Sequence, residues 1–218
     1  MIVEPTAERP RVATYMKVVL LAVVSMSCAM KAPLVQPGAP GEPTRTINAS
    51  QASDLSRIPY TAADVRFMQG MIGHHEQALE MTKLVPSRTS RADMELLAKR
   101  IEISQADEIE MMRDWLKSRG EALPDPHAHH APGATLMPGM LTASEMQQLS
   151  HANEAEFDRL FLTLMIKHHE GALVMVEELF STPGAGQQSD TFAFASDVDA
   201  DQRTEIARMS AMLREGQK

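Results

Sequence analysis

The sequence predicts an all-α protein, a four-helix bundle built from two repeated helical hairpins, and three observations support this prediction. From about residue 60 onward, apolar residues recur at helical spacing and no segment alternates as a strand would. Capping residues and Pro/Gly turns divide this part into long helical runs. A motif of fifteen residues occurs twice, which indicates a duplicated hairpin. Two hairpins joined by a long connection are typical of such a bundle.

The first segment, residues 1–29, is interpreted as an export signal. Basic residues precede the apolar run VVLLAVV at 18–24, and small residues follow it. This run is too short to span a bilayer as a helix. A start at Met16 would leave a complete signal. Two processing sites remain open, cleavage after Ala29 or lipidation at Cys28, and both place the protein in the periplasm or cell envelope.

The next segment, residues 30–59, is rich in Pro and Gly and shows no apolar period. Such a composition predicts a disordered linker. The folded domain is therefore expected at 60–218, with repeats at about 61–119 and 142–215 and a His-rich crossover loop at 120–141.

The first three helical runs each begin with a hydroxyl residue followed three positions later by a carboxylate, the pattern of a capping box. These pairs are Thr61 with Asp64, Ser90 with Asp93, and Thr142 with Glu145. Proline or glycine follows each run and ends it. The expected helices cover residues 61–84, 90–119, 142–150 and then on to 180, and 190–214.

The repeat is centred on a histidine doublet. Residues 67–81 read FMQGMIGHHEQALEM and residues 161–175 read FLTLMIKHHEGALVM, with nine of the fifteen positions identical. The second helix of each hairpin repeats as well, as QADEIEMM at 105–112 and QRTEIARM at 202–209. In each motif a Met, a His and a second Met fall at i, i+3 and i+10 on one helical face, and another His follows the first Met by four residues. These residues are Met71, His74, His75 and Met81 in the first half, and Met165, His168, His169 and Met175 in the second.

This combination of donors favours a soft metal. Thioether sulfur is soft and imidazole is intermediate, so the cluster suits Cu(I) or Ag(I) better than Mg, Ca or Fe. A ferritin-like di-iron site needs Glu three residues before His, and Met71 and Met165 occupy that place here. Glu108 and Glu205 are expected as occasional ligands or as acceptors that orient a His ring.

The second helices are expected to lean toward this face. Counting back from the turns places Gln105 level with Met71 and Gln202 level with His169. These two amides therefore join Glu108 and Glu205 as candidates for orienting the ligands. A methionine stripe is more often ordinary core, because Met fills irregular gaps well. Paired histidines on a buried face are harder to explain by packing, since each needs a partner.

Composition excludes several classes of function. A net charge of -8 and a pI near 5.5 argue against nucleic acid as a partner. A single Cys excludes a disulfide framework and Cys-rich zinc sites. The sequence shows no nucleophile with its base, no phosphate-binding Gly loop and no paired catalytic carboxylates, which argues against hydrolase or kinase chemistry. A non-enzymatic protein is expected rather than an enzyme.

The doubled HH motif, with the following Q-x-x-E-I-x-x-M, resembles the bacterial family called domain of unknown function 305 (DUF305), whose members include the periplasmic copper-binding CopM proteins. The resemblance covers about residues 62–213. It implies a ferritin-like four-helix fold, an envelope location and copper binding through Met and His. The ligands it implies are Met71, His74, His75, Met81 and Met112 in the first half, and Met165, His168, His169, Met175 and Met209 in the second. Met68 is replaced by Leu162 in the repeat, so equal affinity of the two halves is not implied.

The function favoured by these observations is copper or silver binding in the envelope, for buffering, transport or resistance. One alternative is a ferritin-like oxidoreductase that uses iron, and another is a metal-free helical interaction module. The expected partner is a metal ion, with a homo-oligomer or a copper-handling protein as further alternatives. Contact with a membrane is expected only through a lipid at Cys28.

Overall fold

A computed structural model describes residues 34–36, 44–53, 58–125 and 136–216, and the chain divides into two units near residue 53. The expected export signal, Cys28 and the histidines of the crossover loop lie outside these residues. In the first unit, β1 (Leu34–Gln36) pairs antiparallel with β2 (Arg45–Ile47), and α1 (Ala49–Ser53) follows. The sequence predicted no regular structure in this linker. The short runs LVQ and RTI pair because they hold β-branched residues on either side of a Pro/Gly-rich stretch.

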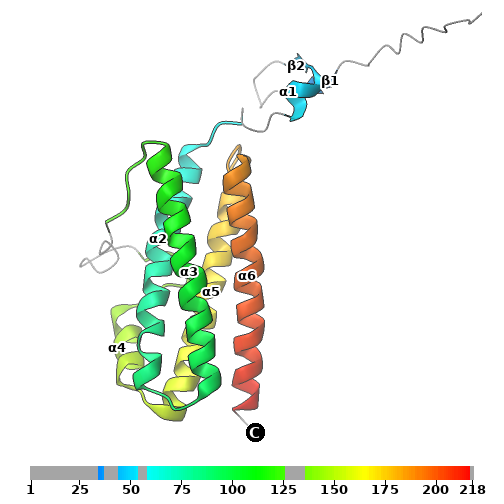
Figure 1. Cartoon of the computed structure of the whole chain (residues 1–218). Helices are drawn as coiled ribbons and strands as arrows, with labels where there is room; N and C mark the ends of the chain where they lie inside the picture. The colour runs from blue at the N-terminus through cyan, green and yellow to red at the C-terminus, as the bar shows by residue number, and fades with distance from the viewer. Residues whose placement is uncertain (1–33, 37–43, 54–57, 126–135, 217–218) are drawn as a thin grey trace, which may run out of the picture. The chain divides into compact units, whose positions relative to one another are not determined.

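The second unit contains the predicted four-helix bundle, formed in its described residues by four long helices (Figure 1). α2 packs on α3, α5 packs on α6, and α2 packs on α5. α3 and α6 lie side by side, but their backbones do not approach each other as closely as those of the three packed pairs. The short helix α4 packs against α5. The bounds are α2 (Ala62–Thr82), α3 (Ala92–Ser118), α4 (Ala143–His151), α5 (Glu154–Ser181) and α6 (Ser189–Glu215).

Two of the three predicted capping boxes are present. Thr61 and Asp64 bond reciprocally at the start of α2, and Thr142 and Glu145 do so at the start of α4. The prediction for Ser90 is wrong, because α3 begins after Arg91, which makes no side-chain cap. The Ser90 hydroxyl instead donates to a carboxylate oxygen of Glu154, 3.2 Å away in the second hairpin.

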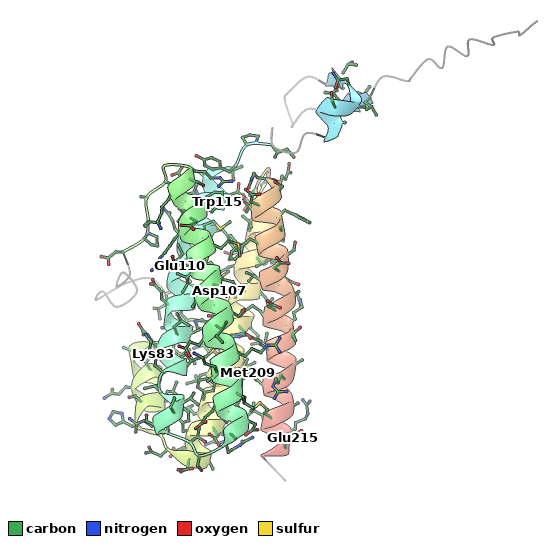
Figure 2. The ribbon with its side chains drawn as sticks, in the orientation of Figure 1. Lys83, Asp107, Glu110, Trp115, Met209 and Glu215 are labelled. Carbon is green, nitrogen blue, oxygen red and sulfur yellow. The ribbon has the colours of Figure 1, made fainter. Side chains whose placement is uncertain are left out.

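The core of the bundle consists of two apolar clusters. One cluster contains Phe67, Ile109 and Val198, and the other contains Ile101, Phe157 and Phe161. Side chains fill the space between the four helices (Figure 2). Among the described helices, none combines the length and the apolar character that crossing a membrane requires.

Candidate metal centre

The four histidines of the two motifs lie in the centre of the bundle. Each of them has 0% of its surface exposed. The rings of His74 and His168 have their centroids 3.9 Å apart and are tilted by 38° to each other. The ring centroids of His75 and His169 lie 6.3 and 6.2 Å from those of their neighbours in sequence. The two HH motifs, far apart in sequence, therefore form one buried layer of imidazoles.

Glutamates of the second helices hold two of these rings. His75 donates through Nε2 to Glu108 at 2.5 Å, and His169 donates through Nε2 to Glu205 at 2.7 Å. Because a carboxylate only accepts, each of these Nε2 atoms carries a proton, and Nδ1 is the ring nitrogen that is left to offer a lone pair. Both Nδ1 atoms are buried without a hydrogen-bond partner.

The register of α3 differs from the one predicted. Since Glu108 is level with His75, Gln105 lies about two helical turns from the level of Met71. The chain reversal is longer than expected: a short 3-10 turn (Val85–Ser87) and four more residues precede α3. In the second hairpin, Glu205 rather than Gln202 is level with His169. Gln105 and Gln202 are buried, and oxygen atoms of both lack partners.

The end of the crossover connection covers this layer. We call residues 137–141, MPGML, the strap. His74 donates through Nε2 to the carbonyl oxygen of Pro138 at 3.0 Å. The Gln77 amide fixes Leu141 twice, accepting from its N–H at 2.7 Å and donating to its carbonyl at 3.0 Å. The strap therefore sets the tautomer of His74, just as Glu108 and Glu205 set the tautomers of His75 and His169.

Glycine on α5 allows the strap to approach. A Cβ atom on Gly171 would lie 2.0 Å from the carbonyl oxygen of Pro138 and 2.5 Å from Cα of Gly139. Sequence reasoning interpreted this stretch only as crossover loop. The available signal was that the helical faces carry Gly70, Gly73 and Gly171, residues that a helix otherwise disfavours.

The strap makes the two repeats unequal. His168 corresponds to His74 in the repeat, but its ring nitrogens lie near the backbone of His74 without a hydrogen bond of good geometry. Burial and then the neighbouring imidazole of His75 lower the pKa of His74 to about 3. Burial, followed by His74 and the other imidazoles, lowers the pKa of His168 well below its usual value. Both rings are therefore neutral and keep a free lone pair at ordinary pH.

All six predicted methionines are buried, but the structure divides them between the two apolar clusters. Met71 and Met112 share one cluster with Met175 of the other repeat. The second cluster holds Met81, Met165 and Met209. The ten candidate residues therefore do not form one sphere, and each group of thioethers combines both repeats. Met68 and Met94, which sequence reasoning did not select, are buried in the same clusters.

Hard donors alone do not form a site in the described part of the chain. No group of three or more His, Cys, Asp or Glu side chains there is disposed to hold a metal. Glu108 and Glu205 are each bonded to an imidazole. The donors that remain are the thioethers of the two apolar clusters, and together with imidazole nitrogen they form a set that matches Cu(I) and Ag(I).

Comparisons with known proteins agree with the fold. The model of the family described as domain of unknown function, DUF305, matches residues 64–213. A DUF305 structure from Streptomyces coelicolor is 29% identical, with a TM-score of 0.61, and the match covers 71% of this chain and 93% of that chain. A DUF305 fragment from Deinococcus radiodurans is 30% identical, with a TM-score of 0.63, and the match covers 72% of this chain and 99% of that chain. A search of curated proteins finds no match.

The fold is also similar to that of CopM in its Cu(II)-bound form. The identity is 23% and the TM-score 0.57, and the match covers 70% of this chain and 96% of that chain. CopM structures with Cu(I) and with Ag are similar as well. Because the family model matches more than half of the sequence, the chain belongs to the DUF305 family.

Proposed function

Starting from membership in the DUF305 family, we propose that the protein is exported and binds Cu(I) or Ag(I) in the centre of its bundle, as a metal buffer or carrier. One observation carries the proposal. The Nδ1 atoms of all four imidazoles are buried and lack a hydrogen-bond partner, while an acceptor holds Nε2 of His74, His75 and His169.

This is the arrangement that a metal-binding histidine requires. A ligating imidazole presents one nitrogen to the metal and donates the other N–H to a carboxylate or a backbone carbonyl. Without a metal, each unpaired buried nitrogen costs about 1–3 kcal/mol of stability. Leucine at these positions would avoid this cost, so packing does not explain four such rings.

The thioethers supply the soft part of the site. Met71 precedes His74 by three residues and His75 by four, so its sulfur lies within one helical turn of both rings, and Met165 has the same relation to His168 and His169. Thioether and imidazole donors together favour Cu(I) or Ag(I). Structures of CopM, which has a similar fold, show it in Cu(I)-bound, Cu(II)-bound and Ag-bound forms, which supports this choice.

The proposal is tested by titrating Cu(I) anaerobically against a competing chelator. We expect tight binding by the parent and at least tenfold weaker binding by the double variant Met71→Leu with Met165→Leu, because both changes keep volume and remove a soft donor. Met146→Leu is the control, since Met146 lies on α4 against the core but outside the HH motifs. Parent-like affinity in the double variant would refute the soft site. Tight Fe(II) binding with oxygen consumption would instead favour a ferritin-like oxidoreductase.

A further inference from the structure

A groove runs between α3 and α6, where the two helices lack close backbone packing. It contains two neighbouring hollows, of about 540 Å³ and about 300 Å³. Figure 2 labels Asp107 and Trp115 on α3, the helix that forms one wall. Asp197 and Phe194 of α6 line both hollows, so the hollows are continuous along the helices.

Methionines line the larger hollow at graded depth. The side of Met111 that faces the groove borders both hollows, and this residue is 50% exposed. Met68 and Met112 line the larger hollow from inside and are 1% and 0% exposed. Met112 belongs to the same cluster as Met71. Methionines therefore line the groove from its half-exposed edge, at Met111, to the buried cluster that contains the proposed ligands Met71 and Met112.

The smaller hollow ends at a residue that contacts the imidazole layer. Glu108 lines it and also accepts the hydrogen bond of His75. Its other wall residues include Asp107, Asp197 and Asp201. Burial, and then the charges of Glu108 and of Glu205, raise the pKa of Asp201, and the contribution of these two charges reflects a negative potential in the groove.

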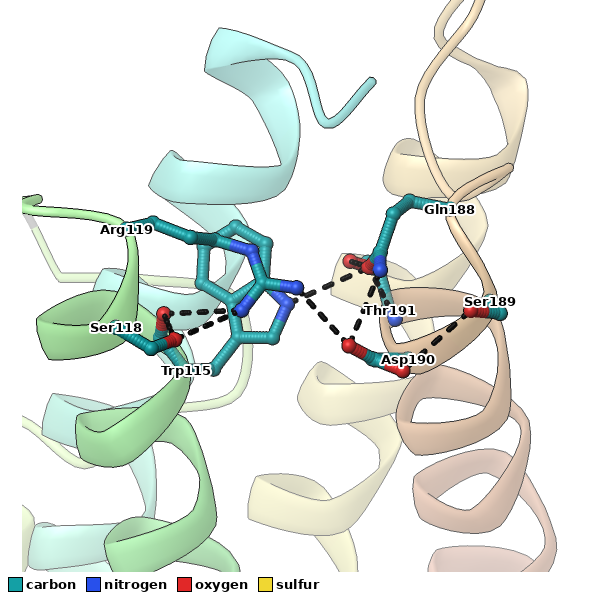
Figure 3. A network of polar contacts seen from close by, with 7 residues as sticks. All are labelled: Trp115, Ser118, Arg119, Gln188, Ser189, Asp190 and Thr191. Atoms are coloured by element: carbon teal, nitrogen blue, oxygen red, sulfur yellow. Dashed lines mark hydrogen bonds and ion pairs between the residues drawn. The ribbon is translucent and has the colours of Figure 1, made fainter. Parts of the chain in front are cut away.

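One end of the groove is closed by a polar network (Figure 3). Arg119 stacks 4.2 Å above the ring of Trp115 and bonds Asp190 at 2.9 Å. Trp115 donates to Gln188 at 3.5 Å, and Gln188 caps the start of α6. This network ties the end of α3 to the start of α6, whereas Met111, half-exposed, borders both hollows farther along the groove.

We propose that the α3/α6 groove is the entrance through which a soft monovalent cation, Cu(I) or Ag(I), reaches the buried ligands, with Met111 as the first thioether it meets. The inference rests on the proposed function. The acidic rim concentrates cations, and the thioethers select the soft ones. The groove between α5 and α6 offers a contrast, because its hollow of about 820 Å³ has acidic residues but no methionine among its described lining residues.

The test measures uptake of Ag⁺ by stopped flow in chloride-free buffer. Trp115 is the only tryptophan of the chain and lines the groove, so its fluorescence reports arrival of the ion. We expect Asp107→Asn with Asp197→Asn to slow uptake about threefold or more at low ionic strength, with the difference shrinking at high salt. Met111→Leu should slow uptake at both salt concentrations. Equilibrium affinity for Ag⁺ should stay within about twofold of the parent in each variant.

The controls remove similar groups elsewhere. Glu177→Gln with Glu178→Gln deletes two exposed charges on α5, and Met146→Leu deletes a thioether on α4. The entrance is refuted if the groove variants load at the parent rate, or if the controls are slowed equally. A parent that binds no Ag⁺ at equilibrium would overturn the proposed function and the entrance with it, whereas tight binding at unchanged rates would overturn the entrance alone.

Discussion

Gly171→Ala should destabilise the protein, although glycine to alanine inside a helix is ordinarily favourable. The new Cβ would lie 2.0 Å from the carbonyl oxygen of Pro138, 2.4 Å from its carbon and 2.5 Å from Cα of Gly139. These are backbone atoms and cannot turn aside as a side chain could. The strap must therefore move away from α5.

The magnitude follows from the bonds that the strap makes. Displacement breaks the two hydrogen bonds between Gln77 and Leu141 and the one between His74 and Pro138, at about 1 kcal/mol each. Residual crowding adds about 1 kcal/mol or more. Better helix propensity returns about 1 kcal/mol. We expect the free energy of unfolding to fall by about 3 kcal/mol.

Urea unfolding followed by circular dichroism measures this change, with Gly73→Ala as the matched control. A Cβ on Gly73 meets only Cε of Met137, at an ordinary 3.6 Å. This variant should be as stable as the parent or up to about 1 kcal/mol more stable. If Gly171→Ala is no less stable than Gly73→Ala, the docking of the strap is refuted.

Two further predictions concern the imidazole layer. Glu108→Gln should weaken Cu(I) binding about 10- to 100-fold, because it removes the charged acceptor that orients His75. The control Glu110→Gln, on the exposed face of the same helix, should leave the affinity unchanged. Equal effects of the two substitutions would exclude an orienting role for Glu108. The metal-free protein should lose stability as pH falls from about 6.5 toward 3. His74 and His168 stay neutral when folded but take up protons when unfolded, so the unfolded state gains about 1.4 kcal/mol per pH unit for each ring. Urea unfolding at pH 7.5, 6 and 5 checks this slope, and the variant His74→Leu with His168→Leu should show a shallower one.

Local rules predicted much of the fold, because they depend on neighbours in sequence. The capping pair at Thr61 and the Pro/Gly turns placed the long helices within a few residues of their observed bounds. Ser90 does not cap α3, because its hydroxyl donates a hydrogen bond to Glu154, a residue distant in sequence. The strands in the expected linker were missed because they are three residues long, too short for an alternating pattern to be visible.

The candidate site was predictable in its residues and less so in its arrangement. Repetition and spacing identified the HH motifs and indicated that Glu108 could accept from a histidine. Which thioethers share a cluster depends on the antiparallel packing of α2 and α5, which sequence spacing within one helix does not determine. The strap over His74 depends on glycines far apart in the chain, at Gly70 and Gly171, whose joint meaning requires the tertiary structure.

In the proposed site, thioether and imidazole bind the metal together. X-ray absorption at the copper edge, on protein loaded with one equivalent of Cu(I), tests it most directly, because sulfur and nitrogen neighbours scatter differently. We predict both kinds of neighbour in the parent and loss of sulfur scattering in the variant Met71→Leu with Met165→Leu. A spectrum with nitrogen and oxygen neighbours alone in the parent would contradict the account.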